Sequence, residues 1–441
     1  MLFFSLGLMS FFGLSYKKYM WVFFYSFFFL LYYMKFLFMT GDSFFSGQFM
    51  FFNFDSVSLF FLYLSVWVCL FSFLPMMYSE NKSSFFLFLL IMTVLVFLFT
   101  TNNIFMFFLT FELSLIPIIF LITSWGSYKE RIFSAYYFLM FTMITSIPLL
   151  ILMGLMVYLG FSNYLNSFFL ISMGGGVNNI PWFLKILVLM GFMSKLPIYG
   201  LHIWLPKAHV DAPVGASMIL AGVLLKLGGY GLMRIFFIMS FMGLSFFFVL
   251  LGVLGYFFTA VICMRQVDMK ILVAYSSVNH MSLAFSGIFS YYYLGFKGSF
   301  FMFFGHGIVS PMMFFFVHFM VFRSMTRLMH GNKGYFSMYS TIMYFMFIFF
   351  IINLGVPPFI NFFGEFGIFS SLFFFNNYFF FFILYGFMMS GVYVYNFFTT
   401  STQGKPNWGF SSLSIYFNEI FICMISLVGI LLSSLFLDTI M

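Results

Sequence analysis

The sequence predicts an all-α polytopic membrane protein with about fourteen transmembrane helices, each needing about 20 apolar residues to cross a bilayer. Three observations lead to this fold class. Of the 441 residues, 64% are hydrophobic and only 6% are charged, and the mean hydropathy is +1.11. Soluble domains carry about 25% charged residues, so lipid must cover most of this surface. Long apolar runs alternate with short polar breaks, and none of these breaks is long enough to form a soluble domain.

In chain order, the expected spans are 2–13, 19–39, 54–77, 84–100, 104–123, 132–160, 181–205, 213–237, 242–263, 270–290, 298–322, 338–373, 378–398 and 412–436. The first is short, and it either crosses the membrane or lies partly in the interface. The whole chain, 1–441, is expected to be a single integral membrane domain. Within it we separate N-terminal helices (1–100), a central core (101–370) and C-terminal helices (371–441).

The basic residues support this alternation of helices and loops. When successive loops are assigned to opposite sides, one side collects most of the lysines and arginines. The other side receives only Lys35, Lys185, Arg234 and Lys297. The positive-inside rule then places both termini on the outer side. The net charge of +8 therefore reports membrane topology, and we expect no binding of nucleic acid.

Two of the expected spans contain helix-breaking residues. Pro197 follows Lys195 in one span, and Pro357 and Pro358 precede Glu365 in the other. Proline removes a backbone donor, and the freed groups must be satisfied by protein or water inside a membrane. Paired interrupted helices in the two halves of a chain are typical of inverted-repeat transporters, whose sites lie near the bilayer midplane.

Four charged side chains stand inside apolar segments: Glu112, Lys195, Lys226 and Glu365. A charge at the bilayer centre costs about 2.5 kcal/mol or more, so each is a candidate functional residue. Glu112 is either a neutral structural acid or part of an ion path. Lys226 is either in a fixed salt bridge, with Glu112 or another acid, or a group that accepts and releases protons. Glu365 is either a last proton acceptor or a partner for a lysine of another subunit.

The histidines fall into two groups. His280 and His306 lie inside apolar spans, where each is either a hydrogen-bonded structural residue or a member of a proton relay. His202 and His209 flank a segment that contains Lys207 near the basic side. These three are expected either to line a proton-uptake path or to cap a helix end. His318 and His330 are left without a role.

Several common sites are missing from the sequence. There is no Walker A motif, no GxGxxG after a strand and no metal-ligand spacing, and Cys69, Cys263 and Cys423 are unpatterned. We therefore expect no cofactor and no redox centre in this chain, so a gradient or partner subunits must supply its energy. The 83 Phe and 37 Met indicate a T-rich coding sequence, as in many mitochondrial genomes.

Four segments resemble one known family: SKLPIYGLHIWLPKAHVDAP (194–213), AGVLLKLGGYG (221–231), FELSLIP (111–117) and AYSSVNHM (274–281), with Trp125-Gly126 and Glu130-Arg131 between them. They resemble the mitochondrially encoded proton-pumping subunits of respiratory complex I, which are related to multisubunit cation/proton antiporters. The clear resemblance covers about residues 100–370, while the two ends match mainly in hydrophobic character.

The resemblance implies a role for each matching residue. Glu112 pairs with the buried Lys195, Lys226 hands protons on through His280 and His306, and Glu365 leads to the outer side. It also implies a multi-pass protein of the mitochondrial inner membrane whose partners are other membrane-arm subunits and lipids. NADH and quinone bind elsewhere in such complexes.

One departure from the family pattern concerns the loop after the helix of His306. Relatives carry an acidic–basic pair there, whereas this loop has Arg323, Arg327, His330 and Lys333 without an acid. Two rivals to a complex I subunit are considered. One is a subunit of a stand-alone sodium/proton antiporter, and the other is a scaffold that holds pumping subunits without conducting.

Overall fold

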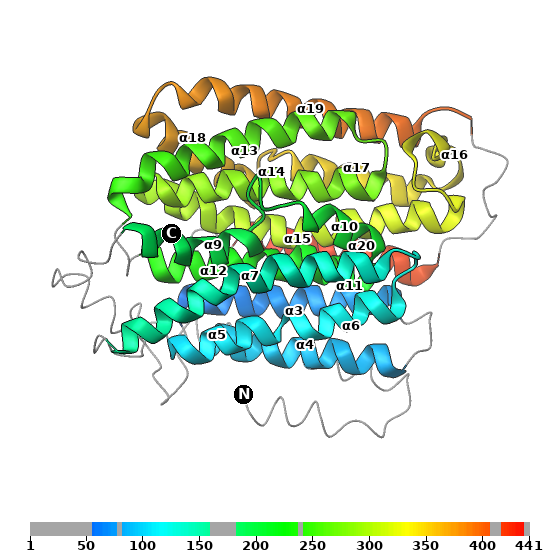
Figure 1. Cartoon of the computed structure of the whole chain (residues 1–441). Coiled ribbons are helices and arrows are strands. Elements are labelled where there is room, and N and C mark those ends of the chain that lie inside the picture. The colour runs from blue at the N-terminus through cyan, green and yellow to red at the C-terminus, as the bar shows by residue number, and fades with distance from the viewer. Residues whose placement is uncertain (1–54, 77–81, 159–181, 237–240, 406–415, 436–441) are drawn as a thin grey trace.

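A computed structural model describes residues 55–76, 82–158, 182–236, 241–405 and 416–435. Within these ranges the chain folds into helices that lie side by side in one bundle (Figure 1). In this view α3 to α6 form one edge of the bundle, and α18 and α19 form the opposite edge. Among the described residues there is no β-strand, and an isolated bridge joins Asp268 and Leu328.

The helices of the described ranges are α3 (Ser56–Met76), α4 (Lys82–Thr100), α5 (Ile104–Leu113), α6 (Leu115–Trp125), α7 (Arg131–Tyr158), α9 (Trp182–Lys195), α10 (Trp204–Asp211), α11 (Val214–Ile219), a π-helical turn (Leu220–Leu224), α12 (Leu225–Phe236), α13 (Ser245–Arg265), α14 (Met269–Phe289), α15 (Tyr293–Ser324), α16 (Tyr335–Met338), α17 (Ser340–Asn353), α18 (Ile360–Phe375), α19 (Phe379–Thr402) and α20 (Phe417–Leu435).

The predicted membrane fold is confirmed. In the described part of the chain, 8 helical segments are long and apolar enough to cross a membrane, and shorter apolar helices accompany them. The expected spans 2–13 and 19–39 lie outside the described residues. Every other expected span coincides with a helix or with a broken helix.

Both predicted helix breaks are present. Helix α9 ends at Lys195 and the chain becomes helical again at Trp204, while residues 354–359 separate α17 from α18. Gly200 and Gly355 have φ of +102° and +68° at these breaks. Glycine adopts this left-handed region without the steric penalty that a Cβ would bring. The chain can therefore leave the helical conformation inside the bundle at these two places.

From the sequence, Pro117, five residues after Glu112, is expected to bend the helix that carries this acid. The interruption lies three residues before the proline. The helix of Glu112 is interrupted at Ser114, between α5 and α6. Pro117 occupies the first turn of α6. Backbone N–H groups in the first turn of a helix have no intrahelical acceptor, so proline costs no hydrogen bond there. The proline therefore begins a helix here, and Glu112 stands just before the interruption.

Helix α15 forms the centre of the bundle and is buried along most of its length. It packs against α14, α17, α18 and α3. Arg323, near its end, forms a two-point ion pair with Glu419 at the start of α20, with N···O distances of 3.2 Å and 2.9 Å. The acid that the loop after α15 lacks in sequence is thus supplied by the C-terminal helix.

Candidate functional site

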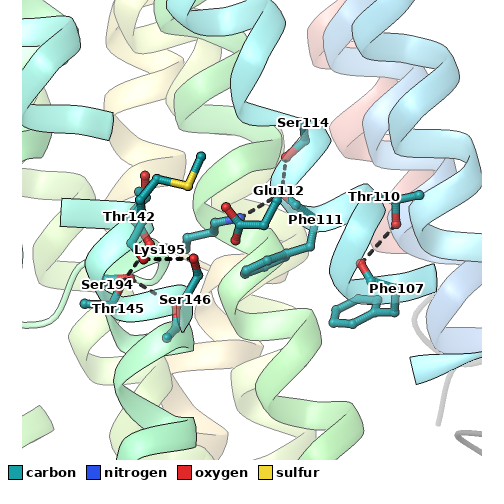
Figure 2. Close-up of polar contacts among 12 residues, drawn as sticks. Phe107, Thr110, Phe111, Glu112, Ser114, Thr142, Thr145, Ser146, Ser194 and Lys195 are labelled. Atoms are coloured by element: carbon teal, nitrogen blue, oxygen red, sulfur yellow. Dashed lines mark hydrogen bonds and ion pairs between the residues drawn. The ribbon is translucent and has the colours of Figure 1, made fainter. Parts of the chain in front are cut away.

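The first intramembrane acid and the first intramembrane lysine meet where two helices are interrupted. Lys195 is the last residue of α9, and its Nζ lies 3.3 Å from Oε1 of Glu112. It also donates a hydrogen bond of 2.8 Å to the carbonyl of Phe111. Figure 2 shows the two charged side chains pointing toward each other, with the Phe111 ring beside the ammonium group.

The surroundings of this pair leave the carboxylate without other support. Apart from the contact with Lys195, neither oxygen of Glu112 has a hydrogen-bond partner among the described residues. The nearby hydroxyls of Thr145 and Ser194 lie 2.6 Å apart and bond to each other (Figure 2). The Lys195 side chain is 4% exposed and that of Glu112 is 15% exposed. In such a low-dielectric environment, the charge state of the pair depends strongly on any new charge nearby.

Lys226 is the second residue of α12, which begins where the π-helical turn ends. This turn leaves the carbonyl of Ala221 free to accept side-chain hydrogen bonds from Lys226 and from Ser310, the latter at 3.2 Å. Lys226 Nζ also lies 3.0 Å from Nδ1 of His306. Single π-turns inside helices are often found at functional sites. Within the described part of the chain, Lys226 forms no ion pair with an acid, so the fixed salt bridge with Glu112 is excluded.

From Lys226 the polar groups continue toward the second break. The rings of His306 and His280 have centroids 5.3 Å apart. His280 Nδ1 in turn lies 3.4 Å from Oε1 of Glu365. His280, His306, Lys226 and Glu365 are all buried. The spatial order is therefore Lys226, His306, His280, Glu365, with His306 rather than His280 next to the lysine.

Glu365 is seated against the break between α17 and α18. A Cβ placed on Gly355 would lie 2.6 Å from Oε2 of Glu365. The side chain of Asn361 donates to the carbonyl of Ile352 at 3.1 Å and packs directly on Gly305, next to His306. The break thus places Gly355 against the Glu365 carboxylate. It also places the Asn361 amide against α15, the helix that carries His306.

The three residues expected on an uptake path are differently placed. His202 lies in the loop between α9 and α10, where its Nδ1 accepts a hydrogen bond of 3.1 Å from the Gly200 amide. Lys207 is exposed and its Nζ lies 3.5 Å from the ring centroid of Tyr137. His209 is fully buried and stacks on Phe314. None of these three described side chains bonds to another, and their uptake role stays a prediction.

Three features of the site were not predicted from the sequence: the π-helical turn that precedes Lys226, the hydroxyl of Ser310 and the amide of Asn361. The small residues Ala221 and Gly222 were the one sequence feature that pointed to the turn. A Cβ on Gly222 would lie 2.8 Å from Pro311 and 2.6 Å from Val68, so a larger residue would separate these helices. Asn361 carries a polar amide beside the second break, which is a signal of the same kind as the intramembrane charges.

No group of three or more His, Cys, Asp or Glu that could hold a metal ion occurs in the described ranges. The expectation of no cofactor stays a prediction.

Comparisons with known proteins show the family of this chain. The family described as NADH:quinone oxidoreductase/Mrp antiporter, TM, matches residues 101–391. The chain is 34% identical over 374 residues to NADH-ubiquinone oxidoreductase chain 4 of Ceratitis capitata, covering 82% of each chain. It is 35% identical to the protein of the same name from Branchiostoma lanceolatum, covering 72% of this chain and 71% of that one.

The chain belongs to the NADH-ubiquinone oxidoreductase chain 4 family. As a member, it is a membrane subunit of an NADH:quinone oxidoreductase. Its fold also matches a chain in the structure of respiratory complex I from Thermus thermophilus with bound NADH. The TM-score is 0.86 at 20% identity, covering 98% of this chain and 94% of that chain.

A chain of the Mrp complex from Dietzia sp. DQ12-45-1b has the same fold, with a TM-score of 0.71 at 18% identity. It covers 81% of this chain and 68% of the other. The fold is therefore shared by complex I and antiporter complexes, and the identity to chain 4 relatives distinguishes between them.

Proposed function

We propose that this chain translocates protons as a subunit of the membrane arm of respiratory complex I. In this proposal, electron transfer from NADH to ubiquinone occurs in other subunits and drives proton movement across the mitochondrial inner membrane. The chain itself holds no redox centre and binds neither NADH nor quinone. Its partners are the neighbouring membrane-arm subunits and membrane lipids.

The observation that carries the proposal is the buried run from Lys226 to Glu365. Four ionisable groups from α12, α15, α14 and α18 follow one another at 3.0 Å, 5.3 Å between ring centroids and 3.4 Å. Burying one such group is costly in a membrane, and burying four in sequence is explained by proton transfer. A purely structural role would require only one matched pair.

Each step in this run moves one proton from a donor to the next group, and the donor is ready again only after it has been reprotonated. The Lys226 ammonium can pass a proton to Nδ1 of His306 across their contact and become a neutral amine. The imidazole then passes a proton toward His280, whose Nδ1 faces the Glu365 carboxylate. Histidine suits the middle positions because both of its ring nitrogens take part in proton exchange.

The Glu112–Lys195 pair supplies the control element. With Glu112 ionised beside it, the buried Lys195 keeps its proton, because the carboxylate compensates the cation. Moving the carboxylate away leaves an uncompensated cation, which favours proton release. Within the described residues no hydrogen bond joins Lys195 to Lys226, so the pair acts on the run through charge or through a bridging group.

The test is a complex assembled with Lys226→Ala and reconstituted into vesicles, with Lys129→Ala as the control, because Lys129 is exposed. We expect proton uptake per NADH oxidised to fall by about tenfold or more, the scale of a lost proton-transfer group, and the control to pump normally. Unchanged pumping by an assembled Lys226→Ala complex would instead favour the scaffold interpretation.

A second candidate, a cation/proton antiporter subunit, is favoured by the fold shared with the Mrp complex. The same vesicles distinguish the two. Sodium-dependent proton movement without NADH and quinone would favour the antiporter.

A further inference from the structure

The last turn of α9 has a carbonyl group that this helix does not pair. In an uninterrupted helix, the carbonyl of Ser194 would accept a hydrogen bond from the amide of Ile198, four positions later. Ile198 lies outside α9, which ends at Lys195, two positions before Pro197. Proline does not continue a helix, so the carbonyls of the preceding turn need partners from elsewhere.

The indole of Trp204 supplies this partner. Trp204 is the first residue of α10, on the far side of the break, and its Nε1 donates a hydrogen bond of 3.0 Å to the Ser194 carbonyl. Trp204 is 1% exposed, and its ring packs on Phe138 of α7, with the ring centroids 4.9 Å apart. One side chain therefore joins the helices on both sides of the break and packs them on α7.

The hydroxyl of Ser194 is bonded to α7 as well. It lies 2.6 Å from the hydroxyl of Thr145 (Figure 2). Gly191 allows this approach, because a Cβ placed there would lie 3.0 Å from the carbonyl of Thr145. The carbonyl and the hydroxyl of Ser194 thus each bond to another helix, and the residue directly before Lys195 is held from two sides.

These bonds fix the backbone from which the Lys195 side chain extends. No helical turn of α9 follows Lys195, and its ammonium makes two contacts with α5: 3.3 Å to Glu112 Oε1 and 2.8 Å to the Phe111 carbonyl. The attraction between two charges is strong in a low-dielectric interior and falls as they separate. A shift of the end of α9 relative to α5 therefore changes the energy of the ion pair.

We propose that Trp204 is a positioning residue for proton translocation. Its indole N–H holds the end of α9, so that the Lys195 ammonium stays within ion-pairing distance of Glu112. This inference rests on the proposed function, in which that pair is the control element. Because Trp204 also begins α10, the bond couples the helix that carries Lys207 and His209 to the pair.

The test is Trp204→Phe, which keeps a buried aromatic ring but removes the N–H group. In assembled complex reconstituted into vesicles, we expect proton translocation per NADH oxidised to fall by roughly two- to tenfold, the effect of one lost hydrogen bond. We also expect the carboxylate stretching band of Glu112, assigned with Glu112→Gln, to shift in the infrared difference spectrum. A side chain that only fills space would leave this band unchanged.

Trp67→Phe is the matched control. Trp67 is 1% exposed, as Trp204 is, but it lies on α3 and packs against Gly429 of α20. Both substitutions remove the same atoms from a buried ring, so they have a similar cost in packing. We expect the control to assemble, to pump normally and to leave the Glu112 band in place.

An unshifted Glu112 band in Trp204→Phe would refute the positioning role, whether or not pumping falls. If this variant does not assemble, an electron microscopy map of the unaltered complex decides. We expect the indole nitrogen within hydrogen-bonding distance of the Ser194 carbonyl. A longer separation beside an intact contact between Lys195 and Glu112 would overturn the proposal.

The outcome is separable from the proposed function. If Lys226→Ala abolishes pumping while Trp204→Phe changes neither pumping nor the Glu112 band, proton translocation stands and the positioning role fails. If Lys226→Ala leaves pumping intact, the proposed function itself fails. A shifted Glu112 band in Trp204→Phe would then still show that Trp204 positions the pair.

Discussion

The two intramembrane acids occupy unlike environments, although each stands beside a helix interruption. Glu112 is 15% exposed and faces a lysine at 3.3 Å, whereas Glu365 is 5% exposed and faces a histidine at 3.4 Å. Lysine is a strong base, so the first contact is an ion pair that holds its charges. Either ring nitrogen of an imidazole can bind or release a proton, so the second contact can share one proton.

This difference indicates that the two glutamates have different functions. A pair of full charges near the edge of the protein responds to charges that approach from outside. A protonated carboxyl group beside a neutral imidazole carries no formal charge, so this form of the inner pair has a smaller desolvation penalty than two full charges. The outer pair therefore suits control, and the inner pair suits transfer.

The largest expected effect follows from removing the inner acid. Glu365→Gln keeps the shape of the side chain but cannot exchange a proton, so the run from Lys226 loses its terminal acceptor. We expect proton translocation per NADH in reconstituted vesicles to fall by about tenfold or more. Glu130→Gln, at an exposed glutamate, is the control. Equal pumping by the two variants would show that protons do not pass through Glu365.

A smaller effect is expected at the outer pair. Lys195→Met leaves Glu112 without its cation, and breaking a buried pair on one side destabilises by about 3–5 kcal/mol, less where a partner is partly exposed. We expect a lower assembled fraction and slower pumping. The double variant Glu112→Gln with Lys195→Met should recover assembly but not pumping, measured by native electrophoresis and vesicle assays. Additive losses in the double variant would argue that the two side chains act independently.

The smallest effect is expected from moving the inner acid without removing it. Gly355→Ala introduces a Cβ 2.6 Å from Glu365 Oε2 and places a non-glycine residue at a φ of +68°. The conformation alone costs about 1–2 kcal/mol. We expect the carboxylate to shift away from His280 and pumping to slow by roughly two- to tenfold.

Gly391→Ala is the matched control, since a Cβ on Gly391 meets nothing within 4 Å. A Gly355→Ala complex that pumps at the rate of the control would mean that the position of the Glu365 carboxylate does not affect pumping. An electron microscopy map of the variant measures the distance between His280 and Glu365.

Much of the fold could be predicted because hydropathy and proline positions act locally. The apolar runs, the breaks after Lys195 and before Glu365, and the four isolated charges are all readable within windows of about 20 residues. The bend near Pro117 was misplaced because a proline can begin a helix as well as bend one. Nothing local indicates that Glu419 would pair with Arg323, which lies 96 positions earlier.

The sequence by itself determined the membrane class, the positions of the charges and the likeness to complex I subunits, because burial cost and motif identity are carried by neighbouring residues. Only the tertiary structure decided the partners. Lys195 bonds to Phe111 across 84 positions, and Lys226 contacts His306 across 80. Such pairings depend on which helices pack together and at what height. That information is distributed over the whole bundle, and it decides whether a buried charge is a fixed pair or a step for a proton.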